Sequence, residues 1–358
     1  MILDIESPLP KNALEATAYV KSGDFFEGRK FKGFSFDGSD LSGGIFTNVL
    51  FEDCSFKGAN LKDAMFNQCR FVNSPFNSTA ASASFIQSEF DSVVIEQSDL
   101  TKANFLGCHL SQVSFAGSEL VHTVFQECRM NQSKFSDCKL ADSVFNENQF
   151  KQLQFEGSDF IKTVLNKCDF GEVEIKNCMF QLMFVTDADL SGMDFSGMDL
   201  TQSQLKNCNL SQCNFSDSNL FQSAFTGSQL DHCRFINTNL ELVNLHEAKL
   251  TNIYAHGSNF SKASLQKAKI ENSIIEESDF TMAQLKDATI TDSQAQRCRF
   301  HYTDFSNGFF YRVEFKDSRF DMALLHNVVE ESCNWSGANP GAAQGTNEQL
   351  KKAETWGK

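Results

Sequence analysis

Twelve cysteines and seven histidines are the side chains of this 358-residue sequence that are best suited to chemistry. Thiolates and imidazoles serve as metal ligands, nucleophiles and disulfide partners, and their spacing decides which role a chain can use. The sequence contains no CxxC pair and no HExxH, phosphate-loop, nucleophile-elbow, EF-hand or dinucleotide-binding pattern. The histidines show no ligand spacing, and we expect all of them to face solvent: His109, His122, His232, His246, His256, His301 and His326. We therefore expect no catalytic residue, no metal site, no cofactor and no enzyme.

The cysteines all occupy one position of a five-residue period. Each lies two residues before a large apolar residue, in a slot that other units fill with serine, alanine, threonine or valine: Cys54, Cys69, Cys108, Cys128, Cys138, Cys168, Cys178, Cys208, Cys213, Cys233, Cys298 and Cys333. Cysteine in this slot behaves as a small buried apolar residue. Two pairs are 20 residues apart, but stacked side chains ~4.8 Å apart suit a disulfide poorly, because its β-carbons lie ~3.8 Å apart.

The five-residue period is the dominant feature of the chain. Between Asp187 and Thr201 the sequence is DADLSGMDFSGMDLT, with Leu190, Phe195 and Leu200 at the centres of successive units. The spacing never slips from Phe85 to Leu325, where one centre every five residues makes 49, all of them Phe, Leu, Ile, Met, Val or Ala. A repeat of this regularity decides the architecture before any motif does.

The stretch DADLSGMDFSGMDL resembles the pentapeptide-repeat family, whose unit is written A(D/N)Lxx. The resemblance covers roughly residues 26–335. It implies an all-β fold, a right-handed quadrilateral β-helix with four pentapeptides per coil and about 15 coils. It also implies that each centre, and the residue two before it, points into the helix.

The pattern predicts three segments. Residues 1–25 form an N-terminal cap with a short helix from Asn12 to Lys21, and residues 26–335 form the β-helix. Only nine residues separate Phe76 from Phe85, so one residue is missing and the register breaks near 75–85. We expect a local distortion near Pro75, since proline donates no ladder hydrogen bond, unless the deletion is harmless.

The repeat ends in this interpretation at Glu330, the first charged centre, with Trp335 as a lid. Residues 336–358 then form a turn-rich linker and a short C-terminal helix, capped by Thr346 or Asn347. The apolar face of that helix carries Leu350 and Trp356, which makes it a candidate dimer element.

The net charge of −15 raises an alternative function. Some pentapeptide-repeat proteins are similar to duplex DNA in shape and charge, and protect type II topoisomerases from quinolones or peptide toxins. DNA carries one charge per ~1.7 Å, far more than this chain, and the charges here are spread over all four faces of the predicted helix. We expect no direct binding of nucleic acid, and a topoisomerase stays an alternative partner.

The N-terminal sequence and the apolar runs bear on localisation. No run is long enough for a transmembrane helix, and no signal peptide is evident. We expect a cytoplasmic bacterial protein without membrane insertion, or one exported by a dedicated secretion system. A secretion-associated effector or adaptor is therefore a third functional class.

One face of the predicted helix carries an apolar stripe. The two residues after each centre should face solvent, and on the face centred on Leu100 to Phe320 eight of twelve coils place a large apolar residue there. The other faces have one or two in 13 coils each. The stripe consists of Val121, Ile161, Leu182, Phe221, Leu242, Met282, Tyr302 and Met322. Exposed apolar stripes mark surfaces that something covers. The sequence therefore predicts a non-catalytic scaffold that binds a protein partner or itself, unless the chain's own termini cover the stripe.

Overall fold

The computed structural model describes residues 9–355 as a parallel β-solenoid of about 15 turns. It divides into two compact units: one runs to Val164 and includes Glu172–Cys178, and the other comprises Leu165–Gly171 and continues from Met179. The all-β solenoid expected from the five-residue period is confirmed. Each coil consists of four five-residue sides.

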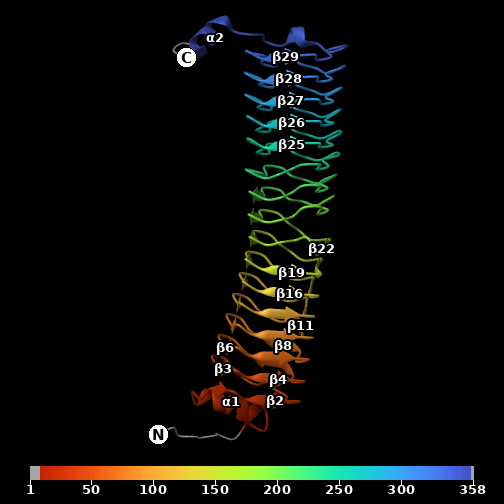
Figure 1. Cartoon of the computed structure of the whole chain (residues 1–358). Coiled ribbons are helices and arrows are strands. Elements are labelled where there is room, and N and C mark those ends of the chain that lie inside the picture. The colour runs from red at the N-terminus through yellow and green to blue at the C-terminus, as the bar shows by residue number, and fades with distance from the viewer. Residues whose placement is uncertain (1–8, 356–358) are drawn as a thin grey trace. The chain divides into compact units, whose positions relative to one another are not determined.

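The first unit stacks short parallel strands on three of its four sides (Figure 1). One side holds β1 (Phe26–Glu27), β3 (Ile45–Thr47), β6 (Met65–Asn67), β9 (Ser84–Ile86), β12 (Asn104–Leu106), β15 (Val124–Gln126) and β18 (Val144–Asn146). The next holds β2 (Lys30–Lys32), β4 (Leu50–Glu52), β7 (Arg70–Val72), β10 (Glu89–Asp91), β13 (His109–Ser111), β16 (Arg129–Asn131) and β19 (Gln149–Lys151). The third holds β5 (Phe56–Asn60), β8 (Phe76–Thr79), β11 (Val94–Glu96), β14 (Ser114–Ala116), β17 (Lys134–Ser136), β20 (Leu153–Glu156) and β22 (Val173–Lys176). The fourth side pairs through single bridges such as Asp99 with Glu119.

The second unit has fewer regular strands and more single bridges between coils. Its longest sheet stacks five strands in sequence order: β25 (Lys249–Thr251), β26 (Lys269–Glu271), β27 (Thr289–Thr291), β28 (Phe309–Tyr311) and β29 (Val329–Glu331). The remaining strands are β21 (Val164–Asn166), which begins in the first unit, β23 (Phe184–Thr186) and β24 (Gln204–Lys206). The helices of the chain are α1 (Ala13–Lys21), α2 (Glu348–Thr355) and the 3₁₀ helix Pro340–Ala342.

The apolar centres stack in ladders because paired residues are 20 positions apart. Phe105 pairs with Phe125, for example, and their rings stack 4.8 Å apart. Each such pair adds about 0.5–1.5 kcal/mol beyond the area that it buries. The ladders of centres fill the interior of the coils as far as Phe320.

Many corners are hydrogen-bonded β-turns that start at a centre residue. In the turn from Leu41, the N–H of Gly44 donates to the carbonyl of Leu41, and Gly43 has a φ of +68°. A positive φ at the third residue is the signature of a type II turn, and it favours glycine or asparagine there. The residue two positions after almost every centre therefore has a left-handed backbone conformation.

The missing residue is absorbed within one coil. Phe56 pairs with Phe76 at an offset of 20, but Asn60 pairs with Thr79 at 19, and the register shifts between Lys57 and Asn60. The offset is 20 again where Thr79 meets Asp99. The register shift therefore lies where the sequence places the deletion.

The described chain starts with a helix that covers the first coil. Asn12 caps α1 by accepting the N–H of Glu15, and Tyr19 stacks on Phe26 with ring centroids 4.6 Å apart. Ala16 and Val20 of α1 are buried. The helix α1 therefore covers the apolar residues of the first coil, which have no preceding coil to pack against.

The solenoid path continues beyond the predicted end of the repeat. Trp335 stacks on Phe315 at 4.5 Å, as expected of a lid, but the chain then makes a further side in which Gln344 pairs with Leu324. The segment interpreted as a linker is therefore largely the last coil. Asn347 caps α2, since its side chain accepts the N–H groups of Gln349 and Leu350.

Candidate functional site

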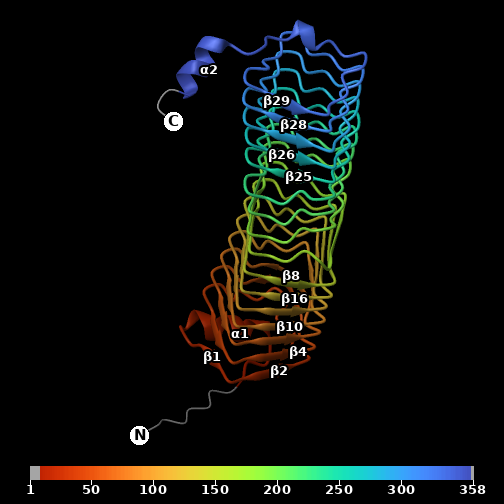
Figure 2. The ribbon, with the colours of Figure 1, turned by 45° about the horizontal axis from the view of Figure 1, so that its top comes forward.

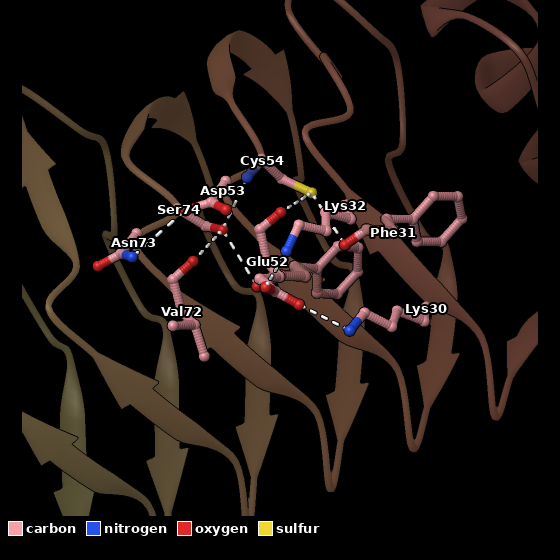
Figure 3. A network of polar contacts seen from close by, with 10 residues as sticks. Lys30, Phe31, Lys32, Glu52, Asp53, Cys54, Val72, Asn73 and Ser74 are labelled. Carbon is pink, nitrogen blue, oxygen red and sulfur yellow. Dashed lines mark hydrogen bonds and ion pairs between the residues drawn. The ribbon is translucent and has the colours of Figure 1, made fainter.

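The cysteine slot is structural. In Figure 3 the Sγ of Cys54 donates to the carbonyls of Phe31 and Glu52, each at 3.5 Å, while its own N–H donates to the Oγ of Ser74. Ser74 repeats this arrangement one coil on, donating to the carbonyls of Phe51 and Val72. Serine and cysteine thus donate hydrogen bonds to equivalent backbone carbonyls in successive coils.

The cysteines, all within residues 9–355, form no disulfide, and most of their thiols are deeply buried. No cysteine among the described residues forms a disulfide, eleven are buried, and Cys333 is half-buried. Burial raises the pKa of the Cys69 and Cys138 thiols to about 12. At these two positions the thiolate, which is the reactive and metal-binding form, is therefore suppressed at neutral pH. Cys128 differs, because its hydrogen bond with Cys108 lowers the pKa of the Cys128 thiol.

One histidine departs from the sequence expectation. His326 is buried, although we expected every histidine to face solvent. Its Nδ1 accepts the N–H of Asn347 at 3.1 Å, and its Nε2 lies 3.1 Å from Glu354 of α2. The difference arises because Asn347 and Glu354, at the start and near the end of α2, contact this side chain, which a five-residue pattern does not reveal. Within residues 9–355 no group of three or more His, Cys, Asp or Glu residues is arranged to hold a metal ion.

Charged side chains pair between coils at the same spacing as the core. Lys32 meets Glu52 at 2.6 Å and Arg297 meets Glu277 at 2.8 Å, each across 20 residues. Hydrogen bonds from Lys30 and Lys32 lower the pKa of Glu52 to about 2 (Figure 3). Many acids are thus paired with bases, and the negative charge is interrupted along the surface.

The stripe residues lie at corner turns. Val121, Ile161 and Phe221 directly follow a centre and are half-buried. The other five, Leu182, Leu242, Met282, Tyr302 and Met322, are the third residues of their turns, with φ between +54° and +60°. Val121 and Ile161 belong to the first unit, and the rest belong to the second.

The part of the stripe in the second unit is open to solvent. Exposed fractions are 38% for Leu242, 51% for Met282, 57% for Tyr302 and 45% for Met322, whereas Leu182 is half-buried. Met282, Tyr302 and Met322 occupy the same corner of three successive coils, 20 residues apart. No described segment of the chain covers these three side chains.

The backbone at this corner is a feature that the sequence pattern alone did not reveal. Among the described residues, the left-handed corner positions otherwise hold Gly, Asn, Asp, Gln, Glu, Lys, Arg, His or Ser. Apolar and aromatic residues occur there only at the five stripe positions. The signal that could have found them is the turn itself, which places a positive φ two residues after each centre.

Family profiles match most of the repeat region. Residues 98–180 and 223–300 match a profile described as "Pentapeptide repeat region", and residues 35–72 and 186–222 match "Pentapeptide repeats (8 copies)". The chain belongs to the pentapeptide-repeat family. A search of curated proteins gives no match.

Solved structures of other pentapeptide-repeat proteins align with this member of the family. Full-length QnrB1, a plasmid-mediated fluoroquinolone resistance protein, is 14% identical, covers 64% of this chain and 91% of its own, and has a TM-score of 0.24. HetL, a pentapeptide-repeat protein involved in heterocyst differentiation regulation in the cyanobacterium Nostoc sp. strain PCC 7120, is 18% identical, with 77% and 94% covered and a TM-score of 0.22. These likenesses concern the repeat fold.

The helices of this pentapeptide-repeat protein are short. Within the described residues, neither α1 nor α2 is long and apolar enough to cross a membrane. Leu350 of α2 is exposed, while Trp356, the other residue of the predicted dimer face, lies outside the described residues.

Proposed function

We propose that this pentapeptide-repeat protein is a non-catalytic scaffold that binds a protein partner, or a second copy of itself, through the apolar stripe. The observation that supports the proposal is the presence of Leu242, Met282, Tyr302 and Met322 at exposed left-handed corner positions. These residues leave between 38% and 57% of their surface open to solvent. The proposal explains why they are there.

Energetics argue against a purely structural role for these residues. A left-handed backbone costs a residue with a β-carbon roughly 1–2 kcal/mol, which glycine avoids and asparagine offsets by local hydrogen bonding. Apolar side chains at these corners add that cost and are only partly buried in return. Strained backbone positions of this kind gather at functional sites, where binding offsets the cost.

The chemistry of the corner suits a protein surface. Methionine is flexible and polarisable, and tyrosine combines a large apolar ring with a polar hydroxyl, so both are enriched at interfaces. Met282, Tyr302 and Met322 recur once per coil, or about every 4.8 Å. A partner that follows the solenoid would meet one apolar side chain in each coil.

A second candidate is protection of a type II topoisomerase, favoured by the net charge of −15. The ion pairs between coils weigh against it, because a DNA mimic needs uninterrupted negative charge. A gyrase supercoiling assay with and without a quinolone tests this candidate. Protection by wild-type protein would support it, and an unchanged inhibition curve would remove it.

Light scattering on purified protein tests whether the stripe serves self-association. The double variant Phe221→Asp with Leu242→Lys places two opposite charges on the stripe while leaving the buried centres intact. A wild-type dimer that becomes monomeric in this variant would assign the stripe to self-association, with α2 and Leu350 as the second element to examine. A wild-type monomer leaves the stripe to a foreign partner. A dimer unaffected by the double variant would contradict self-association through the stripe.

A further inference from the structure

The last coil of the solenoid is hollow. Its four centre positions, which keep the five-residue spacing, hold Glu330, Trp335, Pro340 and Gly345 instead of a complete set of apolar side chains. A cavity of about 350 Å³ opens there, lined by Phe310, Leu325, Val328, Glu330, Trp335, Pro340, Gly345 and Thr346. Gly345 has no side chain to place above Leu325, which is consequently half-buried although it is a centre residue.

The cavity adjoins an open sheet edge. Strand β29 is the edge of the sheet β25–β29, and all three of its residues are exposed. Figures 1 and 2 show α2 extending away from this stack of strands instead of lying across its end. Within the described residues, no strand pairs with the outer side of β29. Its N–H and C=O groups on that side are a template for one more strand.

The geometry points to a specific occupant. We propose that the outer edge of β29 takes up an extended segment of a partner protein that carries a basic residue and, two residues away, a large apolar residue. The basic side chain pairs with Glu330 and the apolar side chain enters the hollow coil. Side chains two residues apart on a strand face the same way, so one segment can meet both demands.

The fold's own ladders support the basic residue. At the outward position before a centre, the next coil can place a base beside an acid, as in Arg299 next to Asp279 at 2.8 Å and Lys139 next to Glu119. Glu330 ends its ladder without a following coil on that side. The cavity has room for a large apolar side chain and is lined mainly by apolar residues.

A second copy of the chain fits this edge less well. Two β29 strands that met about a twofold axis would set Glu330 and Glu331 of one copy against the same acids of the other. Like charges directly opposite each other destabilise a strand pair. The edge therefore favours a segment of opposite charge over self-pairing, and the site is separate from the apolar stripe.

Capped heptapeptides provide the probe. Threonine fills the outward positions, and phenylalanine and lysine occupy inward positions two residues apart, in either order, to allow parallel or antiparallel addition. One control peptide replaces lysine by glutamate, and another places phenylalanine and lysine next to each other, on opposite faces. Binding is measured by fluorescence anisotropy of the labelled peptide on the full chain.

Two variants report on the two halves of the site. Gly345→Phe fills the hollow, and the structure tolerates a β-carbon there, because nothing lies within 4 Å of it and the backbone φ is not positive. Glu330→Gln removes the charge, with Glu331→Gln as the matched control on the same strand. We expect wild type and Glu331→Gln to bind one peptide order below about 1 mM, and each site variant to weaken binding by roughly tenfold or more.

Folding and self-association are checked in parallel. Gly345→Phe should melt no lower than wild type, because the added ring packs on Leu325 and Phe310. The proposal is overturned if neither peptide order binds wild type, if the glutamate peptide binds equally well, or if Gly345→Phe and Glu330→Gln bind as tightly as wild type. It is also overturned if Gly345→Phe converts a wild-type dimer to a monomer, since the occupant is then a second copy.

Discussion

The proposed binding function rests on a few apolar residues at the corner turns. Among the described residues, only five left-handed corner positions hold apolar or aromatic residues, and all five lie on the same side of the coil, after centres 180, 240, 280, 300 and 320. A turn that favours glycine or asparagine at its third position accommodates these residues at a cost in stability. The apolar residues at these five positions are therefore not explained by the conformation of the turn.

Replacing Met282, Tyr302 and Met322 by asparagine should stabilise the protein. Asparagine tolerates the left-handed region, so each substitution relieves part of a cost of roughly 1–2 kcal/mol, and the triple variant should melt several degrees higher than wild type. Differential scanning calorimetry measures this shift. A lower melting temperature would show that these side chains stabilise the folded chain, against the proposal.

Ser78 offers a second test at a single buried position. Its hydroxyl is buried and has no hydrogen-bond partner within the described residues, while its N–H donates to the Oγ of Ser98 at 3.1 Å. Ser78→Ala should raise the free energy of unfolding by about 1 kcal/mol, because a hydroxyl without a partner leaves the interior. Ser98→Ala should lower it by about 1–3 kcal/mol, since it strips the acceptor from a buried N–H. Equal effects of the two variants in chemical denaturation would refute this assignment.

Elements at the start of the described chain depend on an ion pair between a helix and a coil. Lys21 of α1 lies 2.8 Å from Asp40, and hydrogen bonds from Lys21 and Ser42 lower the pKa of Asp40 to about 2. An unfolded aspartate titrates near 3.9. Since the folded pKa is the lower one, the stabilisation is complete above about 4 and is lost as the pH falls through about 2.

Asp40→Asn should therefore loosen α1 at pH 6 and have no further effect near pH 2. Hydrogen exchange of the α1 amides measures the change, because docking of the helix protects them. Lys21→Gln should produce the same loss at pH 6, and the double variant should add nothing to either single variant. Additive effects would mean that Lys21 and Asp40 act independently.

The five-residue period predicts the parts of the fold in which each unit packs in the same way as its neighbours. Centres such as Phe105 and Phe125, and slot residues such as Cys54, follow from spacing alone, since each unit solves the same packing problem as its neighbour. The last coil escaped prediction because Glu330 and Gly345 keep the register without being apolar. The residue types there indicate the end of the repeat, but the backbone still pairs with the preceding coil, as Gln344 does with Leu324.

Other features depend on geometry that no residue type announces. The backbone of Tyr302 is left-handed because Tyr302 is the third residue of its turn. The residue type does not predict this conformation, since tyrosine seldom adopts it. His326 is buried by α2, which lies beyond the repeat, so its position in the period predicted exposure. The eight-residue stripe could be listed from the sequence, but the left-handed backbone of five of its members required the structure.

At the scale of the whole molecule, apolar centres fill the interior up to the last coil, and the proposed binding function lies on the surface. The core ladders and the paired charges between coils are devices of the solenoid. The stripe is not required by the fold, since other corners hold Gly, Asn, Asp or Gln at the same position. Its removal should leave the solenoid intact.

The most direct test is quantitative affinity capture from the source cells with three baits: wild type, the triple variant of Met282, Tyr302 and Met322 to asparagine, and Gln222→Asn. The last variant changes the same turn position on the same side without removing an apolar residue. The account predicts that at least one protein, or a differently tagged copy of this chain, is retained by wild type and Gln222→Asn and lost from the triple variant. Identical sets of proteins on all three baits, with the triple variant fully folded, would contradict it.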